Sequence, residues 1–164
     1  MDNQETGKAT VYIETSVISY LTARPSRDII VGAQQQLTAD WWENQRSKYA
    51  LFVSTVVVEE AAGGDATAAI RRLDALTGIT VLEVTDEITR VAAYLLQCGA
   101  VPQTAVQDAL HIAISAVYRI QFLMTWNYKH IANAVMRDAI NEACRAAGYH
   151  APVICTPVEL GGIE

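Results

Sequence analysis

The stretch VYIETSVIS, residues 11–19, places a single acid directly after a short apolar run. Its first three residues are β-branched or aromatic, which is typical of a strand entering a protein core. Glu14 follows this run at once, and two hydroxyl residues and a second apolar run come after it. Two interpretations of Glu14 are open: it caps a helix that begins there, or it faces a positively charged partner. The stretch therefore predicts a buried strand that ends at a carboxylate.

Four more short runs have the composition of strands, and longer helical patterns separate them. The five expected strands are 10–13, 50–54, 80–83, 122–125 and 153–155. The expected helices are 16–21, 26–45, 55–62, 66–76, 86–98, 104–118 and a last one that ends before Gly148. Short strands that alternate with helices indicate an α/β fold with a mainly parallel sheet. Because ligands of such sheets bind beyond the carboxyl ends of the strands, polar residues just past those ends are the candidates for a site.

Capping residues set several of the expected helix starts. Ser26 has a suitable side chain to cap the second helix, and Thr85 has one for the fifth. Thr104 begins a stretch with the spacing of a capping box, which predicts the start of the sixth helix. Asn127 is the expected cap of the last helix.

Length and composition bound the class of protein. The chain has 164 residues, the size of one ordinary domain, and we expect a loose tail over 1–9 and a single domain over 10–164. No apolar stretch reaches the roughly 18 residues of a membrane span, and the polar start MDNQETGKAT is no signal peptide. The three cysteines suggest neither a disulfide framework nor a CxxC metal site. A cytoplasmic protein without a membrane partner is therefore expected.

The formal net charge is −6. This value argues against a protein that holds nucleic acid through a broad basic surface. It is compatible with a nuclease that takes its positive charge from bound metal ions, because acidic ligands lower the formal charge. Scattered arginines could still form a local basic patch: Arg24, Arg27, Arg46, Arg71 and Arg72.

Oxygen-bearing side chains follow several of the expected strands. Glu14 comes after the first strand, and Glu59 and Glu60 lie in the helix after the second. Asp108 falls in the first turn of the sixth helix, and Asn127 follows the fourth strand. Carboxylate and amide oxygens are hard ligands that suit Mg²⁺ or Mn²⁺ better than zinc. If these segments converge, they predict a metal site at one edge of the sheet.

Each of these residues also has a structural explanation. Glu59 and Glu60 point about 100° apart on a helix, so at most one of them aims at a shared site. Asp108 is stabilised by the helix dipole, and Asn127 has the side chain of a cap. His111 lies one turn after Asp108. For this histidine, a hydrogen-bonded structural role is preferred to that of a catalytic base.

Taken together, four motifs resemble those of PIN-domain proteins, and more narrowly of VapC-type toxins from toxin–antitoxin pairs. VYIETSVIS resembles the opening strand of the family with its acid and hydroxyl, and STVVVEEAAGGD resembles the second acidic segment. TAVQDALHIAIS and FLMTWNYKHIAN resemble the third and fourth segments, and CTPVEL resembles the common ending. The resemblance runs from about Val11 to Leu160. In the second segment, the acid four residues before the second glycine matches, which selects Glu60 over Glu59.

The resemblance implies a fold and an activity. The fold would be a three-layer α/β sandwich, with a central, mainly parallel sheet of about five strands flanked by helices. The activity would be that of a toxin, a metal-dependent endoribonuclease that hydrolyses RNA phosphodiester bonds with Mg²⁺ or Mn²⁺. Carried over to this chain, Glu14, Glu60 and Asp108 would be the catalytic metal ligands. Asn127 would complete the polar ring, and Ser16 would supply a supporting hydroxyl. A cognate antitoxin that covers the site and a homodimer are implied as well.

Two departures from the family pattern motivate an alternative. The first acid of the family is usually aspartate, whereas Glu14 is one methylene longer. Asn127 and His130 stand where members often have an acid. The alternative is a catalytically weak or inactive PIN-like module that binds RNA or a protein partner. A small-molecule α/β enzyme is disfavoured, because the chain has no GxGxxG, GxxxxGK[ST] or GxSxG motif.

Overall fold

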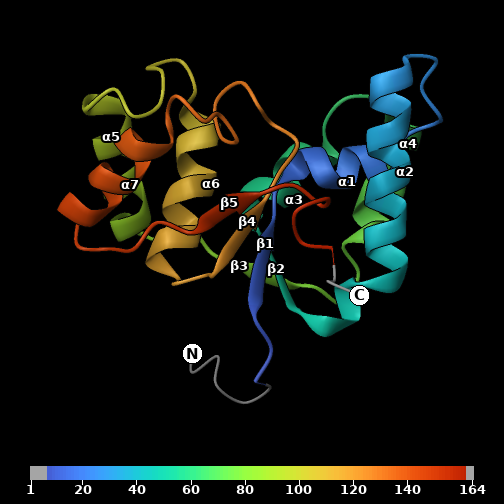
Figure 1. Ribbon diagram of the computed structural model, residues 1–164, viewed down its shortest axis with the longest axis horizontal. Coiled ribbons are helices and arrows are strands. Elements are labelled where there is room, and N and C mark those ends of the chain that lie inside the picture. Colours follow the sequence, from blue (N-terminus) through green and yellow to red (C-terminus); the bar gives the residue numbers. More distant parts are fainter. Residues whose placement is uncertain (1–6, 162–164) are drawn as a thin grey trace.

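Five short strands form a parallel sheet in the order β3-β2-β1-β4-β5 in the computed structural model, which describes residues 7–161 (Figure 1). The strands are β1 (Thr10–Ile13), β2 (Ala50–Ser54), β3 (Thr80–Leu82), β4 (Phe122–Met124) and β5 (Val153–Cys155). All four strand pairings are parallel, so the carboxyl ends of the strands lie along one edge. Every residue of the central strand β1 is buried, as its apolar composition predicts.

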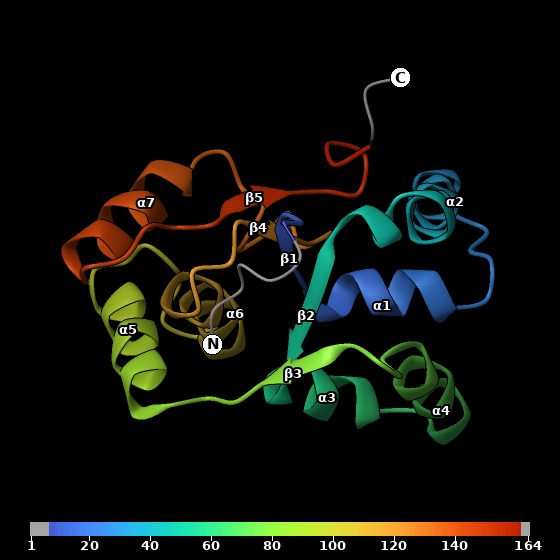
Figure 2. The same cartoon turned by 90° about the horizontal axis from the view of Figure 1, so that it is seen from below.

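Helices cover both faces of the sheet (Figure 2). On one face lie α5 (Asp86–Gln97), α6 (Val106–Val117) and α7 (Arg137–Ala146). On the other side lie α1 (Thr15–Thr22), α2 (Ile29–Asn44), α3 (Thr55–Ala62) and α4 (Ala66–Ala75), with the short 3-10 helix η1 (Arg46–Lys48) after α2. This arrangement confirms the predicted three-layer α/β sandwich with a parallel five-stranded sheet. None of the helices within 7–161 is long and apolar enough to cross a membrane.

The strand predictions are close to the observed bounds. Three strands, β1, β2 and β5, have the predicted bounds, and β3 and β4 each end one residue early. The residue that β4 lacks is Thr125, whose backbone N–H still donates to the carbonyl oxygen of Cys155 at 2.9 Å. Its side-chain hydroxyl donates to the carboxylate of Glu14, so the residue after β4 contacts the residue after β1.

Two predicted caps are wrong at the starts of α2 and α6. Asp28 caps α2, because its Oδ1 accepts a hydrogen bond from the Val31 N–H at 2.9 Å. Ser26 lies further back and accepts from the N–H of Asp28. Helix α6 begins after Ala105 and has no side-chain cap, so the capping box at Thr104 does not form. Thr85 caps α5 as predicted, since its Oγ1 accepts from the N–H of the third helical residue at 3.3 Å.

Asn127 does not cap the last helix, which is a third correction. Helix α7 begins at Arg137, after Met136, and no side chain caps it. The Oδ1 of Asn127 instead accepts from the N–H of His130 at 3.1 Å, which closes a turn directly after β4. Its amide nitrogen is bound to Asp108, so both ends of the Asn127 side chain are engaged at the site.

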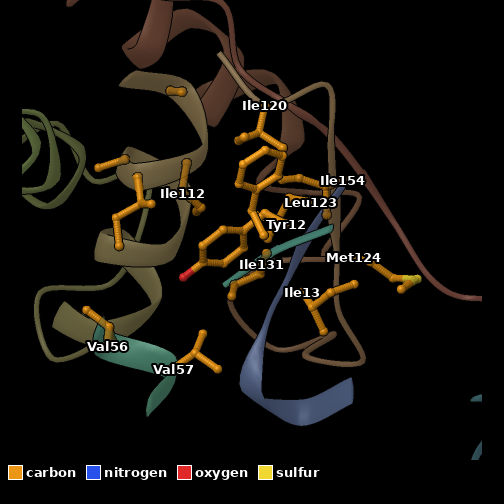
Figure 3. Packing of buried hydrophobic residues seen from close by; sticks show 14 of the residues in the cluster. Tyr12, Ile13, Val56, Val57, Ile112, Ile120, Leu123, Met124, Ile131 and Ile154 are labelled. Atoms are coloured by element: carbon orange, nitrogen blue, oxygen red, sulfur yellow. The ribbon is translucent and has the colours of Figure 1, made fainter. Parts of the chain in front are cut away.

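The core encloses the central strands and so fixes where they end. Tyr12 and Ile13 of β1 and Leu123 of β4 are fully buried. They pack with Ile112 of α6 (Figure 3). Each such side chain contributes about 1.5–3 kcal/mol to folding when it is completely removed from water. The carboxyl ends of β1 and β4 are therefore held rigidly by the packing beneath them.

Most of the predicted loose tail, residues 1–6, lies outside the described residues. Its last residues adjoin β2 and the segment before it. The Nζ atom of Lys8 donates to the carbonyl oxygen of Ser47 at 2.8 Å. The carbonyl oxygen of Ala9 accepts from the N–H of Ala50 at 2.9 Å, so the chain enters the sheet from there.

Candidate active site

The predicted site residues lie at the carboxyl edge of the sheet. Glu14 directly follows β1, and Glu60 comes from α3, which follows β2. Asp108 lies in the first turn of α6, and Asn127 comes after β4. This is the edge at which open parallel sheets bind their ligands, because the loops after the strands meet there.

Glu14 is almost completely buried and is held by several donors. Its side chain is the N-cap of α1 and accepts from the backbone N–H of Ser16 at 3.1 Å. The hydroxyls of Ser16 and Thr125 donate to the same oxygen, Oε2, the latter at 2.7 Å. The Oγ of Ser16 in turn accepts from the N–H of Trp126 at 2.8 Å. These contacts fix one oxygen of the carboxylate and leave the other, Oε1, facing His111 at 4.0 Å.

A basic side chain, that of His111, faces the second carboxylate oxygen of Glu14. It is fully buried, with Nδ1 2.7 Å from the Tyr12 hydroxyl and Nε2 2.6 Å from Oε1 of Glu60. Burial alone lowers the pKa of His111. The hydrogen bond to Glu60 and the charges of Glu14 and Glu60 outweigh burial and raise this pKa above its ordinary value. Glu14 is thus the cap of α1, as the first interpretation predicts, and it also faces a histidine whose pKa is raised.

Glu60 is the acid of its helix that turns toward the site. Its Oε1 accepts from the Thr15 hydroxyl at 2.9 Å in addition to the contact with His111. Burial raises the pKa of Glu60, but the hydrogen bonds from His111 and Thr15 and the charge of His111 lower it below its ordinary value. The side chain is 33% exposed, so it lies where solvent meets the core. The neighbouring acid Glu59 is exposed.

A buried hydrogen-bond chain connects the site to the core. The Tyr12 hydroxyl lies 2.7 Å from Oγ of Ser54 as well as 2.7 Å from His111. Ser54 accepts from the N–H of Val57 and so caps α3. Figure 3 shows the Tyr12 ring extending from β1 with its hydroxyl end directed away from the strand. Burial raises the pKa of Tyr12, so this hydroxyl stays neutral and can bridge His111 and Ser54.

Asp108 belongs to a second group of polar side chains. Its Oδ1 accepts from Nδ2 of Asn127 at 3.0 Å, and its Oδ2 lies 2.7 Å from Nδ1 of His130. Asp108 and His111 are one turn apart on α6, so they share a face of that helix. The charge of Asp108 is also one of those that raise the pKa of His111. The second group therefore lies next to the first.

The predicted residues share one edge but divide between these two groups. Glu14, Ser16 and Glu60 gather around His111, whereas Asp108 and Asn127 gather around His130. Within residues 7–161, no three His, Cys, Asp or Glu side chains are grouped so that they could hold a metal ion as they lie. The donor chemistry still suits a hard cation.

Two carboxylate oxygens are available to such a cation. Oε1 of Glu14 and Oε2 of Glu60 accept no hydrogen bond from any part of the chain between 7 and 161.

Sequence reasoning missed the two threonine donors, Thr15 and Thr125. The signal for Thr125 was present, because it follows β4 directly as Glu14 follows β1. Thr15 lies beside Glu14 in the opening stretch and was noted only as a hydroxyl. Tyr12 carried no such signal, since a tyrosine inside an apolar run is typical of core packing.

Comparison with known proteins relates this fold to solved structures. No family model and no curated protein matches the sequence. A chain of VapBC2 from Rickettsia felis, solved bound to a DNA fragment from its promoter, aligns with a TM-score of 0.58 and 12% identity over 90% of this chain and 98% of that one. VapC20 from Mycobacterium tuberculosis, a toxin that cleaves the sarcin-ricin loop, aligns with a TM-score of 0.56 and 17% identity over 87% of this chain and 99% of that one. At these identities the alignments establish the fold.

Proposed function

We propose that this chain, which has the PIN-domain fold of VapC toxins, is a metal-dependent endoribonuclease and the toxin of a toxin–antitoxin pair. The observation that carries the proposal is the presence of three carboxylates, Glu14, Glu60 and Asp108, at the carboxyl edge of this fold. One of the similar structures is a toxin that cleaves an RNA loop, which supports the same class of activity.

Each site residue has a proposed role. Glu14, Glu60 and Asp108 would hold Mg²⁺ or Mn²⁺, and Asn127 would add an amide oxygen. A bound divalent cation of this kind polarises a phosphate and makes a bound water acidic enough to act as a nucleophile. Ser16 fixes one oxygen of Glu14 and so leaves the other free as a ligand.

Charge balance explains how three acids can share this edge. Two carboxylates about 4 Å apart repel by on the order of 4 kcal/mol at an effective dielectric constant near 20. In the structure His111 lies against Glu60, and His130 lies against Asp108. A metal ion that takes these two acids as ligands therefore competes with two histidine contacts. We expect this competition to weaken metal affinity relative to a site of free carboxylates.

The partners belong to the same proposal. A cognate antitoxin is supported by the VapBC2 complex among the similar structures. The first two residues of α2, Ile29 and Ile30, are 89% and 70% exposed, which gives a protein partner an apolar contact. A homodimer and a cytoplasmic location, where RNA is available, complete the proposal.

Cleavage of RNA by the isolated chain tests the activity. The purified protein is incubated with RNA and Mn²⁺, with a parallel sample carrying Asp108→Asn and another containing EDTA. We expect cleavage that both changes abolish, because both remove the metal site. Cleavage that survives EDTA and the substitution would overturn the proposed mechanism.

A non-catalytic PIN-like module that binds RNA or a protein is the second candidate. The contacts of Asp108 with Asn127 and His130 favour it, since they occupy both oxygens of that acid. Thermal melting with millimolar Mg²⁺ or Mn²⁺ distinguishes the two, because a ligand that binds the folded state raises the melting temperature. An unchanged melting temperature together with intact RNA binding would establish the second candidate.

A further inference from the structure

A groove runs along α7 on the side of the molecule where β5 forms the edge of the sheet. Arg137, Asn141 and Arg145 lie at spacings of four residues, so they form one stripe on this helix. The stripe lines a cavity of about 330 Å³ together with Tyr149 and the chain that leads into β5. The two arginines are about 12 Å apart along the helix axis, at 1.5 Å per residue.

A second cavity continues from the first. Its volume is about 690 Å³, and it shares Tyr149, His150, Ala151 and Val153 with the first. Arg119 lines its far part. We call the two cavities together the α7 groove.

The α7 groove is basic in a chain whose net charge is −6. Among residues 7–161, its lining includes three arginines and no aspartate or glutamate. The acids of α7, Asp138 and Glu142, line neither cavity. The predicted basic patch consisted of other arginines, so this groove is a feature that the sequence did not indicate.

The three arginines of the groove form no ion pair within the described part of the chain. Arg119, Arg137 and Arg145 are exposed, and no ion pair joins them to another part of the chain over 7–161. Arg90 differs, because it forms an ion pair with Glu87 at 2.6 Å. Unpaired guanidinium groups along a groove are available for an anionic ligand.

Arg119 occupies a backbone position that favours glycine. Its φ is 57°, and among the described residues it is the one non-glycine residue in the left-handed region. It follows the end of α6, where the N–H of Ile120 donates to the carbonyl oxygen of Ser115. Glycine is the usual residue after such a helix end. The left-handed backbone of Arg119 therefore costs free energy that glycine would not.

The groove begins close to the candidate active site. Arg137 and Ile154 line the same cavity, and Ile154 directly precedes Cys155, the last residue of β5. The carbonyl oxygen of Cys155 accepts from the N–H of Thr125, whose hydroxyl holds Glu14. The Arg137 end of the groove is therefore the end directed toward the edge of the sheet that carries the acids.

We infer that the α7 groove binds the phosphate backbone of single-stranded RNA, with the Tyr149 ring as a stacking surface for a base. Arginine suits phosphate because its planar fork donates two parallel hydrogen bonds to phosphate oxygens. A basic groove with an aromatic residue is the general pattern of proteins that bind single strands without reading their sequence. The choice of RNA rests on the proposed function, whereas the phosphate site rests on the groove itself.

Salt dependence of RNA binding tests the inference. The affinity of the full chain for a fluorescent single-stranded RNA is measured over a range of salt concentrations in EDTA, and a gel checks that the RNA stays intact. Each phosphate contact adds about 0.7 to the slope of log K against log salt for a single strand. We therefore expect the double variant R137Q/R145Q to lower the slope by about 1.4. The double variant R24Q/R27Q, which removes two exposed arginines outside the groove, leaves it unchanged. Equal slopes for the wild type and R137Q/R145Q would overturn the inference.

Substitutions at Tyr149 and Arg119 add two independent readouts. Tyr149→Ala removes the ring and should weaken binding roughly fivefold or more with little change in slope, because stacking is not ionic. Tyr149→Phe keeps the ring, loses only the hydrogen bond to Glu87, and should bind like the wild type. Arg119→Gly relieves the backbone, so we expect weaker RNA binding without a lower melting temperature. Weaker binding by Tyr149→Phe to the same extent as by Tyr149→Ala would show that the ring does not stack.

The outcomes separate this inference from the proposed nuclease activity. RNA binding that depends on the groove, without cleavage in Mn²⁺, would keep the groove and reject the nuclease. Cleavage in Mn²⁺ with an unchanged salt slope would keep the nuclease and reject the groove. Binding of an acidic peptide but no RNA would assign the groove to a protein partner and also overturn the inference.

Discussion

Nε2 of His111 lies 2.6 Å from Oε1 of Glu60, and the histidine is fully buried while the glutamate is partly exposed. The same nitrogen lies 4.0 Å from Glu14. One imidazole therefore faces two acids from separate strand–helix units of the sheet. His111 therefore links these acids at the edge of the sheet, because it contacts Glu60 directly and the nearby acids raise its pKa.

Replacing His111 tests this role as a fold-stabilising contact. His111→Ala leaves a cavity and removes a partner from both Tyr12 and Glu60, so we expect the free energy of unfolding to fall by about 2–3 kcal/mol. This loss is smaller than the loss expected on breaking a fully buried ion pair, because water can reach Glu60 and replace the missing contact. Urea unfolding measures it, and the exposed residue His150, changed to Ala, should cost less than about 0.5 kcal/mol. A loss below 1 kcal/mol for His111→Ala would contradict the role.

The hydroxyl of Thr125 provides a second test, since it donates to Glu14 and accepts from the N–H of Asn127. Thr125→Val keeps the shape but leaves both groups without this partner. We expect a loss of about 2 kcal/mol, because the bond to Glu14 involves a charged acceptor. Thr125→Ser keeps the hydroxyl and should recover most of that loss. Chemical unfolding compares the three proteins, and equal stability of the Val and Ser variants would show that the hydroxyl does not matter.

Much of this architecture could be predicted from sequence because it follows from local patterns. A buried strand such as β1 has a strong apolar signal, and parallel strands bring their ends to one edge, so the region of Glu14, Glu60 and Asp108 was found. The hydrogen-bond partners could not be predicted, because they come from side chains far apart in the chain. Tyr12 and His111 are an example: a hydrogen-bonded role was predicted for His111, but nothing in the sequence identified Tyr12 as its partner.

The wrong caps show the same limit in a local setting. Asn127 has a good side chain for a cap, yet its amide is bound to Asp108 and its carbonyl oxygen to the turn at His130. Tertiary contacts thus determine the role of Asn127, although its local propensity favours a helix start. The basic lining of the α7 groove was missed for a related reason, since Arg119 and Arg137 line adjoining cavities only because of the fold.

Metal binding gives a third prediction, which concerns His130. If the cation needs Asp108, the contact between His130 and Asp108 competes with it. We expect Mn²⁺ to raise the melting temperature of the wild type. At a concentration 100 times the dissociation constant, a bound ion adds about 2.7 kcal/mol to the free energy of unfolding. His130→Ala should enlarge this shift at a fixed Mn²⁺ concentration, and Asp108→Asn should reduce it. Differential scanning fluorimetry measures all three, and a smaller shift for His130→Ala would show that His130 supports the metal instead.

The cysteines give a fourth prediction, which tests the packing of the sheet and α7. Burial raises the pKa of Cys144 to about 11 and that of Cys155 to about 12, whereas Cys98 is exposed. The thiolate is the reactive form, so the raised pKa of Cys144 slows its reaction at pH 8 in addition to the shielding by burial. We expect iodoacetamide to label one cysteine in the folded protein and all three in guanidinium chloride. Mass spectrometry counts the labels, and rapid labelling of Cys155 in the folded protein would contradict the buried position of β5.

The last prediction concerns stability in acid and rests on Glu87 of α5. Hydrogen bonds from Arg90 and Tyr149 lower the pKa of Glu87 to about 2. A carboxyl group whose pKa is lower in the folded than in the unfolded state stabilises the fold above its unfolded pKa, and this contribution is lost as the pH falls toward the folded pKa. Glu87→Gln should therefore reduce stability near pH 6 and make little difference near pH 2. Urea unfolding at several pH values measures the difference between the two proteins. We expect it to shrink steadily below about pH 4.5, and a difference that grows in acid would show that Glu87 is not held by these donors.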